Sequence, residues 1–297
     1  MQADPITTRR SKPSRQHNRR VRATKVATTE FVLATGRISA FLQLDSGPTV
    51  LLIHGNSSCK EIFVQQLATL CNAGYGVLVP DLPGHGASSN ARRASHDYSF
   101  PGYAAVIRLL LDELAIAEVH ILGWSLGGHI GLELLATEKR VRSLMITGTP
   151  PIKPGPNVVE EAFLSSPAMG LTGKRVLTRN EVLTYGTCMV GSRRFLNNHL
   201  VSAIRRTDGN ARHWMVKNGL GGVGTDEAAT VRKSTRPLAV VHGTRDVFIN
   251  PDYLKSLKYR ALWRKTIQFL DAGHAPHWQR PRLFNKLLLQ FLEETRA

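Results

Sequence analysis

The 297-residue chain lacks any long apolar run and has few cysteines. No apolar stretch approaches the ~20 residues that a helix needs to cross a bilayer, so we expect a soluble, cytoplasmic protein. The three cysteines, Cys59, Cys71 and Cys188, are odd in number, scattered and without metal-ligand spacing. This pattern fits a reducing compartment.

Acidic residues are also scarce: 22 Asp and Glu stand against 39 Lys and Arg, a formal net charge of +17. Residues 1–27 hold a cluster of this charge without the apolar core that a secretory or twin-arginine signal requires. A disordered basic arm is the favoured interpretation, with an organellar transit peptide and an over-extended start as the alternatives. The arm is a candidate contact for anionic surfaces. No recognised nucleic-acid motif accompanies it, so no specific nucleic-acid partner is expected.

From about Thr28 onward, strand-like and helix-like segments alternate, which predicts an α/β fold with a doubly wound, mostly parallel sheet. Strands are expected in a hairpin over 30–42 and at 50–53, 76–80, 119–122, 142–147, 238–242 and 266–270. This core comprises residues 28–149 and 237–297. Between its two parts, residues 150–236 show only helical spacing. An insertion between two strands should lie over the carboxyl edge of the sheet, and it is interpreted as a helical cap.

The segment Gly123-Trp124-Ser125-Leu126-Gly127 lies between a predicted strand and a predicted helix. A G-x-S-x-G sequence in this context is typical of a nucleophile elbow, a tight turn that exposes the serine hydroxyl above the sheet. Glycines two residues to either side leave room for strand and helix to approach each other. The sequence therefore predicts Ser125 as a nucleophile and Trp124 as a substrate contact beside it.

A serine hydroxyl needs a general base and a group that orients the base. In proteins that carry this type of elbow, the acid follows the nucleophile in chain order and the histidine comes last. Asp246 follows the strand at 238–242, and His274 follows the strand at 266–270. The competing acid position, residues 148–151, has no carboxylate. His277 could be mistaken for the base or pair with His274 on a metal, but no third ligand is suggested, so neither metal nor cofactor is expected.

Two backbone N–H groups should stabilise the oxyanion, one from Leu126 and one from the loop after the strand at 50–53. Asn56 is the residue assigned to that loop position, with a purely turn-shaping role as the alternative. Four other histidines are interpreted as turn or core residues bonded to local backbone: His54, His85, His129 and His242.

Taken together, His54-Gly55-Asn56, the Asp81–Gly86 segment (DLPGHG), the serine elbow, Asp246 and Gly273-His274 resemble the α/β-hydrolase superfamily from about Glu30 to the C-terminus. A narrower resemblance rests on four segments, which read YSFPGY at 98–103, MITGTPP at 145–151, RTDG at 206–209 and GHAP at 273–276. These resemble the branch that contains α/β-hydrolase-type N-acyl-homoserine lactonases, which open lactone rings without a metal.

The resemblance implies a nucleophile at Ser125, a base at His274 and oxyanion donors at Asn56 and Leu126. Asp246 departs from it, because such lactonases carry a glutamate there. A tyrosine of the cap that contacts the lactone would match Tyr185, although the register of this match is not fixed by the sequence.

The leading hypothesis is a serine-dependent hydrolase of carboxylic esters or lactones, with N-acyl-homoserine lactone as the favoured small-molecule substrate. A cofactor-free perhydrolase or a C–C bond hydrolase with the same triad is the alternative. A non-catalytic ligand receptor on the same fold is a third interpretation, which turnover would exclude. Apolar residues of the insertion are expected in part to line an acyl-chain pocket: Phe163, Leu164, Met169, Leu171, Val182, Leu183, Met189 and Phe195.

Overall fold

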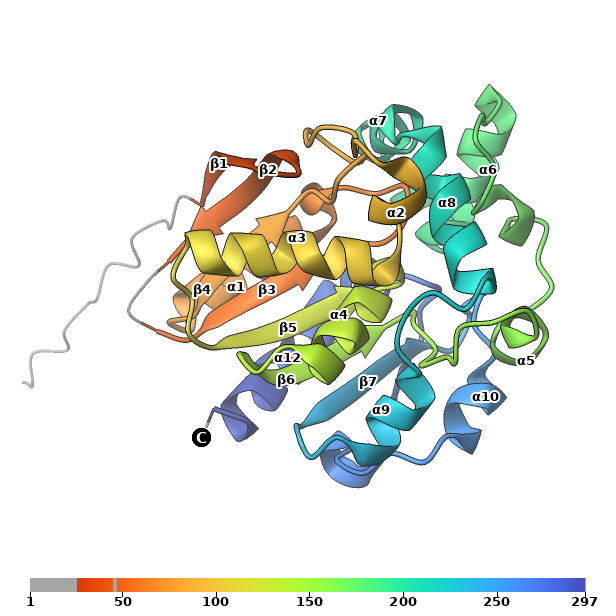
Figure 1. The fold of residues 1–297 in the computed structure, drawn as a ribbon. Coiled ribbons are helices and arrows are strands. Elements are labelled where there is room, and N and C mark those ends of the chain that lie inside the picture. The colour runs from red at the N-terminus through yellow and green to blue at the C-terminus, as the bar shows by residue number, and fades with distance from the viewer. Residues whose placement is uncertain (1–25, 45–46, 297) are drawn as a thin grey trace, which may run out of the picture.

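The computed structural model describes residues 26–44 and 47–296, so most of the predicted basic arm (1–27) lies outside the described residues. An eight-stranded sheet runs through the molecule in the order β1-β2-β4-β3-β5-β6-β7-β8 (Figure 1). The strands are β1 (Ala27–Leu33), β2 (Gly36–Gln43), β3 (Thr49–Ile53), β4 (Gly76–Pro80), β5 (Val119–Trp124), β6 (Val141–Thr147), β7 (Leu238–Gly243) and β8 (Gln268–Leu270). β2 is antiparallel to both β1 and β4, and the other neighbours are parallel. The predicted mostly parallel sheet is confirmed.

Helices cover both faces of this sheet, which explains why its central strands are apolar on both sides. In β3, for example, Val50 and Leu52 pack with helices of one face, whereas Leu51 and Ile53 pack with helices of the other. The helices of the core are η1 (Lys60–Phe63), α1 (Val64–Asn72), α2 (Ala94–Asp97), α3 (Phe100–Glu113), α4 (Leu126–Thr137), α10 (Pro251–Ser256), η4 (Trp263–Lys265), α11 (Pro276–Gln279) and α12 (Pro281–Glu294). Within the described ranges, none is long and apolar enough to cross a membrane.

The insertion between β6 and β7 is helical, and Figure 1 shows its helices α5 to α8 gathered at one end of the sheet. Its elements are α5 (Val158–Ala162), η2 (Met169–Leu171), α6 (Arg179–Met189), η3 (Arg193–Phe195), α7 (Asn198–Arg206), α8 (Gly209–Leu220) and α9 (Glu227–Lys233). The last of these, α9, packs on core helix α4.

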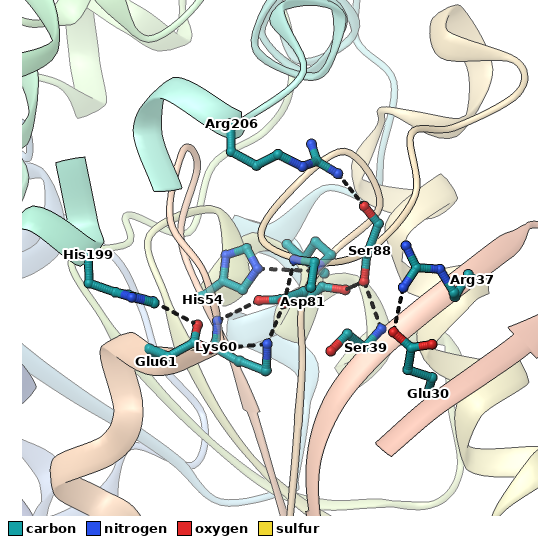
Figure 2. Close-up of polar contacts among 12 residues, drawn as sticks. Glu30, Arg37, Ser39, His54, Lys60, Glu61, Asp81, Ser88, His199 and Arg206 are labelled. Atoms are coloured by element: carbon teal, nitrogen blue, oxygen red, sulfur yellow. Dashed lines mark hydrogen bonds and ion pairs between the residues drawn. The ribbon is translucent and has the colours of Figure 1, made fainter. Parts of the chain in front are cut away.

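The segment Arg206–Gly209 fastens the insertion to the core. The backbone N–H of Asp208 donates to the carbonyl oxygen of Gly84 at 2.8 Å, and the hydroxyl of Tyr98 donates to an Asp208 carboxylate oxygen at 2.7 Å. Arg206 reaches the carbonyl oxygen of Ser88 from the same segment (Figure 2). Asp208 also caps α8 by accepting from the N–H of Asn210. Arg206 and Asp208 therefore fix α7 and α8 relative to the core.

Beneath this contact lies a buried ion pair between Lys60 and Asp81 (Figure 2). The two charged groups are 2.8 Å apart, and the Asp81 carboxylate also accepts from the backbone N–H groups of Lys60 and Ala87. A Cβ on Gly86 would lie 2.2 Å from the Asp81 carboxyl carbon, so only glycine fits there. The pair ties the loop after β3 to the loop after β4.

We expect Asp81→Ala to lower the free energy of unfolding by about 3–5 kcal/mol, because the buried Lys60 ammonium loses its closer, fully buried partner and keeps only Glu61, at 3.1 Å. Asp112→Ala is the matched control. Asp112 pairs with Arg140 on the surface, where its side chain is 62% exposed, and such a pair contributes at most about 1 kcal/mol. Urea denaturation measures both. Equal losses in the two variants would contradict a structural role for the buried pair.

Candidate active site

Ser125 occupies the turn between β5 and α4 with φ 53° and ψ −119°. Residues other than glycine rarely adopt this backbone conformation. The turn is held by its own hydrogen bonds: the Ser125 N–H donates to the carbonyl oxygen of Thr147, and the Thr149 hydroxyl donates to the Ser125 carbonyl oxygen, both at 2.9 Å. Only glycine fits at positions 123 and 127, because a side chain at either position would overlap backbone atoms. A Cβ on Gly127 would lie 1.9 Å from the carbonyl oxygen of Ile53, and one on Gly123 would lie 2.4 Å from that of Gly127.

His274 and Asp246 form a buried pair in which His274 Nδ1 lies 2.8 Å from Asp246 Oδ2. The other carboxylate oxygen, Oδ1, accepts from the backbone N–H groups of Phe248 and Ile249. Burial by itself would raise the pKa of Asp246, but the His274 imidazole and these N–H donors hold it below its ordinary value. Asp246 is therefore a carboxylate, and it fixes His274 with Nδ1 as the donor and Nε2 free to accept a proton.

Trp124 helps to place His274, since its indole N–H donates to the His274 carbonyl oxygen at 2.8 Å. His277 is fully buried, and neither of its ring nitrogens has a hydrogen-bond partner among the described residues. Its ring packs against those of Trp124, Phe63 and Phe284. His277 is thus a core residue in this geometry, and it is His274 that opens onto the pocket.

The two predicted oxyanion donors border the same pocket as Ser125. Leu126 is the first residue of α4, where backbone N–H groups have no partner within the helix. Asn56 follows β3, and its side-chain amide donates to the carbonyl oxygen of Thr172 at 2.9 Å and to the hydroxyl of Tyr185 at 3.3 Å. These bonds hold the Asn56 loop against the insertion. Burial raises the pKa of Tyr185 to about 12, so its phenol stays protonated.

The pocket encloses about 900 Å³, including its open mouth, and Ser125, Trp124 and His274 lie on its wall. Its remaining wall is mainly apolar and comes from core and insertion alike: Phe100, Ile152, Phe163, Met169, Met189, Met215, Leu220, Phe248 and Ile249. Of the eight apolar insertion residues predicted for such a pocket, Phe163, Met169 and Met189 line it. Other members of that set, such as Leu171 and Leu183, pack on the neighbouring hydrophobic core.

Two residues of the pocket region were not anticipated from the sequence. His129 was expected to bond local backbone, as His54 and His85 do with Gly55 and Pro83. That expectation is wrong for His129, whose Nδ1 lies 2.9 Å from a carboxylate oxygen of buried Glu227, while its ring stacks on Phe100. No local pattern could have found this pair, because its members are 98 residues apart.

The Ser125 backbone predicts an unusual ranking of two variants. Ser125→Ala keeps Cβ and with it the backbone strain, which costs on the order of 1–3 kcal/mol. Ser125→Gly removes that strain, and glycine ordinarily costs only about 0.4–1 kcal/mol through the unfolded chain. We therefore expect the glycine variant to be more stable than the alanine variant by about 1 kcal/mol in urea denaturation. The reverse ranking would show that the turn is not strained.

His277 predicts a pH dependence of stability. Burial lowers its pKa to about 3, from an ordinary value of about 6.5. The unfolded chain therefore binds the proton more readily, and stability falls as pH drops from about 6.5 towards 3. Relative to His277→Phe, the native protein should lose about 2 kcal/mol more between pH 7.5 and pH 5. Parallel pH profiles of unfolding free energy in the two proteins would contradict the buried neutral state.

Comparisons with known proteins agree with this architecture. The model of the Alpha/beta hydrolase family matches residues 50–287. A solved structure of N-acyl homoserine lactonase AidH, complexed with N-butanoyl homoserine, is 35% identical with a TM-score of 0.86, covering 91% of this chain and 97% of that one.

Two curated relatives have other activities in their names. The pimeloyl-[acyl-carrier protein] methyl ester esterase of Aeromonas salmonicida is 26% identical, over 83% of this chain and 96% of its own length. The 2-hydroxy-6-oxononadienedioate/2-hydroxy-6-oxononatrienedioate hydrolase of Escherichia coli K12 is 24% identical, over 82% of this chain and 86% of its own length.

The family match spans most of the described residues, and the sheet order and the elbow agree with it. This chain belongs to the alpha/beta hydrolase family.

Proposed function

We propose that this protein is a serine-dependent hydrolase that opens lactones, with N-acyl-homoserine lactones as the preferred substrates. The observation that carries the proposal is a single apolar pocket bordered by both Ser125 and His274, in a chain 35% identical to an N-acyl homoserine lactonase. The buried carboxylate of Asp246 behind His274 supplies the third member of a Ser-His-Asp triad.

In the first half of the reaction, Ser125 Oγ attacks the lactone carbonyl carbon while its proton passes to His274 Nε2. The imidazolium that forms is stabilised by Asp246, which accepts the Nδ1 proton. Negative charge develops on the carbonyl oxygen, and in this proposal the backbone N–H groups of Asn56 and Leu126 donate hydrogen bonds to it. Collapse of the intermediate breaks the ring C–O bond, and the departing alkoxide takes the proton from His274.

In the second half, His274 takes a proton from water, the resulting hydroxide attacks the acyl carbon, and Ser125 leaves with that proton. A lactone adds a difficulty here, because the freed alcohol remains tethered. When well oriented, such a group can re-attack with an effective molarity of about 10⁵ M or more. We propose that Tyr185, whose hydroxyl lies beside Asn56, hydrogen-bonds the freed alcohol and holds it away from the acyl carbon.

The insertion at residues 150–236 acts in this proposal as a cap that selects the acyl chain. Phe163, Met169 and Met189 contribute apolar surface near Ser125, and each buried methylene contributes about 0.8 kcal/mol to binding. The preference for a long acyl chain should therefore come from these side chains. No metal or cofactor takes part in the proposed chemistry.

The proposal is tested by following proton release from N-acyl-homoserine lactones of increasing chain length, alongside cleavage of p-nitrophenyl esters. We expect lactone opening whose kcat/KM rises with chain length, and a loss on the order of 10⁶ in kcat for Ser125→Ala. Rapid ester cleavage with no lactone opening at any acyl-chain length would show that the protein is an esterase and not a lactonase. Stoichiometric binding without turnover would instead indicate a receptor.

Tyr185→Phe separates the proposed role of the phenol from general packing. The variant keeps the ring and its edge contact with Phe248 but loses the hydroxyl, so lactone opening should fall more than p-nitrophenyl ester cleavage. The ratio of the two kcat/KM values is the measurement. Tyr259→Phe, which removes a hydroxyl that donates to the Leu254 carbonyl oxygen away from this pocket, is the control that should leave this ratio unchanged. Equal losses on both substrates in Tyr185→Phe would contradict the role.

A further inference from the structure

A second cluster of chemically active side chains lies outside the pocket, where helix α7 of the insertion meets the loop after β3. Cys59 Sγ, a carboxylate oxygen of Glu61 and a ring nitrogen of His199 all lie within 4.8 Å of one another. Figure 2 shows His199 reaching down from α7 towards Glu61, and the distance from His199 Nε2 to Glu61 Oε2 is 3.4 Å. None of these three residues takes part in the proposed reaction or in the contacts of the Arg206–Gly209 segment described above.

We propose that Cys59, Glu61 and His199 bind one zinc ion that links helix α7 to the core. Thiolate, carboxylate and imidazole are ligands that zinc takes in proteins, and three of them leave a fourth position for water. Nitrogen and oxygen ligands about 2.1 Å from a tetrahedral ion lie roughly 3.4 Å apart, which is the spacing found between His199 and Glu61.

The charges around the cluster are compatible with a divalent cation. Burial and the neighbouring Glu61 carboxylate raise the pKa of the Cys59 thiol, so the ion must displace that proton to solvent. The resulting thiolate and the Glu61 carboxylate then neutralise the two positive charges of the ion. The nearby Lys60 ammonium contacts Glu61 through the other oxygen, Oε1, at 3.1 Å. Lys60 is itself paired with Asp81 at 2.8 Å. Lys60 thus contacts Oε1, whereas Oε2 is the Glu61 oxygen that lies beside His199.

This site could not be predicted from the sequence. Zinc ligands are ordinarily recognised as Cys and His residues a few positions apart, whereas His199 is 140 residues from Cys59. The fold brings them together through the packing of α7, whose Leu200 and Ile204 line a small cavity together with Ile62 of η1. An ion here would add a second fastening of the insertion, beside the one made by Asp208.

The test uses the full chain, stripped of metal with a chelator and titrated with Zn²⁺ against a chromophoric competitor in the absence of substrate. We expect one ion per chain. Cys59→Ser and His199→Gln should each weaken Zn²⁺ binding by more than about tenfold. Even the loss of a residue that only hydrogen-bonds a zinc ligand can weaken binding by that factor. Cys188→Ser and His213→Gln, changes of the same kind elsewhere in the insertion, should bind as the native protein does.

His199 is 58% exposed in its side chain, so His199→Gln is expected to fold and decides the matter even if Cys59→Ser does not. The absence of a stoichiometric ion, or binding that both substitutions leave intact, would overturn the proposal. Binding lost only in a His274→Ala variant would assign the ion to the catalytic pocket instead. Because no turnover is measured, the result is independent of the proposed hydrolase reaction.

Discussion

The close approach of backbones at the turn between β5 and α4 is the constraint on which the rest of the site depends. Gly127 touches the end of β3, and Ser125 is hydrogen-bonded to the end of β6. Three strand ends are thereby fixed relative to one another, together with the loops that follow them. Asn56 follows the first of these strands, and Thr149 follows the third. A side chain at Gly123 or Gly127 would separate these elements without any change to Ser125, Asp246 or His274.

Two buried pairs of polar side chains, each containing a carboxylate, lie around this turn. One joins Asp246 to His274 and fixes the imidazole at the pocket. The other joins Lys60 to Asp81 and ties together the loops on which the insertion rests. Removing one member of such a pair is costly in a protein interior. The two pairs therefore maintain a defined geometry at the carboxyl edge of the sheet, where the pocket lies.

The sheet, the elbow and the placement of Asp246 and His274 could be predicted because each depends on local patterns. Apolar runs, a G-x-S-x-G turn and polar residues after strands all occupy short stretches of sequence. The environment of His129 could not be predicted, since its partner Glu227 comes from a helix 98 residues away. The cluster of Cys59, Glu61 and His199 could not be predicted for the same reason. Long-range packing of the insertion creates both, and no local spacing encodes it.

The central claim is that Ser125 is a nucleophile activated by His274 and oriented by Asp246. Labelling with a small fluorophosphonate, followed by peptide mass spectrometry, tests it most directly. The serine oxygen displaces fluoride from the reagent and is phosphonylated, a reaction that is fast when a neighbouring base activates the hydroxyl. The account predicts one phosphonyl group per chain, located on Ser125, and much slower labelling of Asp246→Asn. Labelling of a different residue, or an unchanged rate in Asp246→Asn, would contradict it.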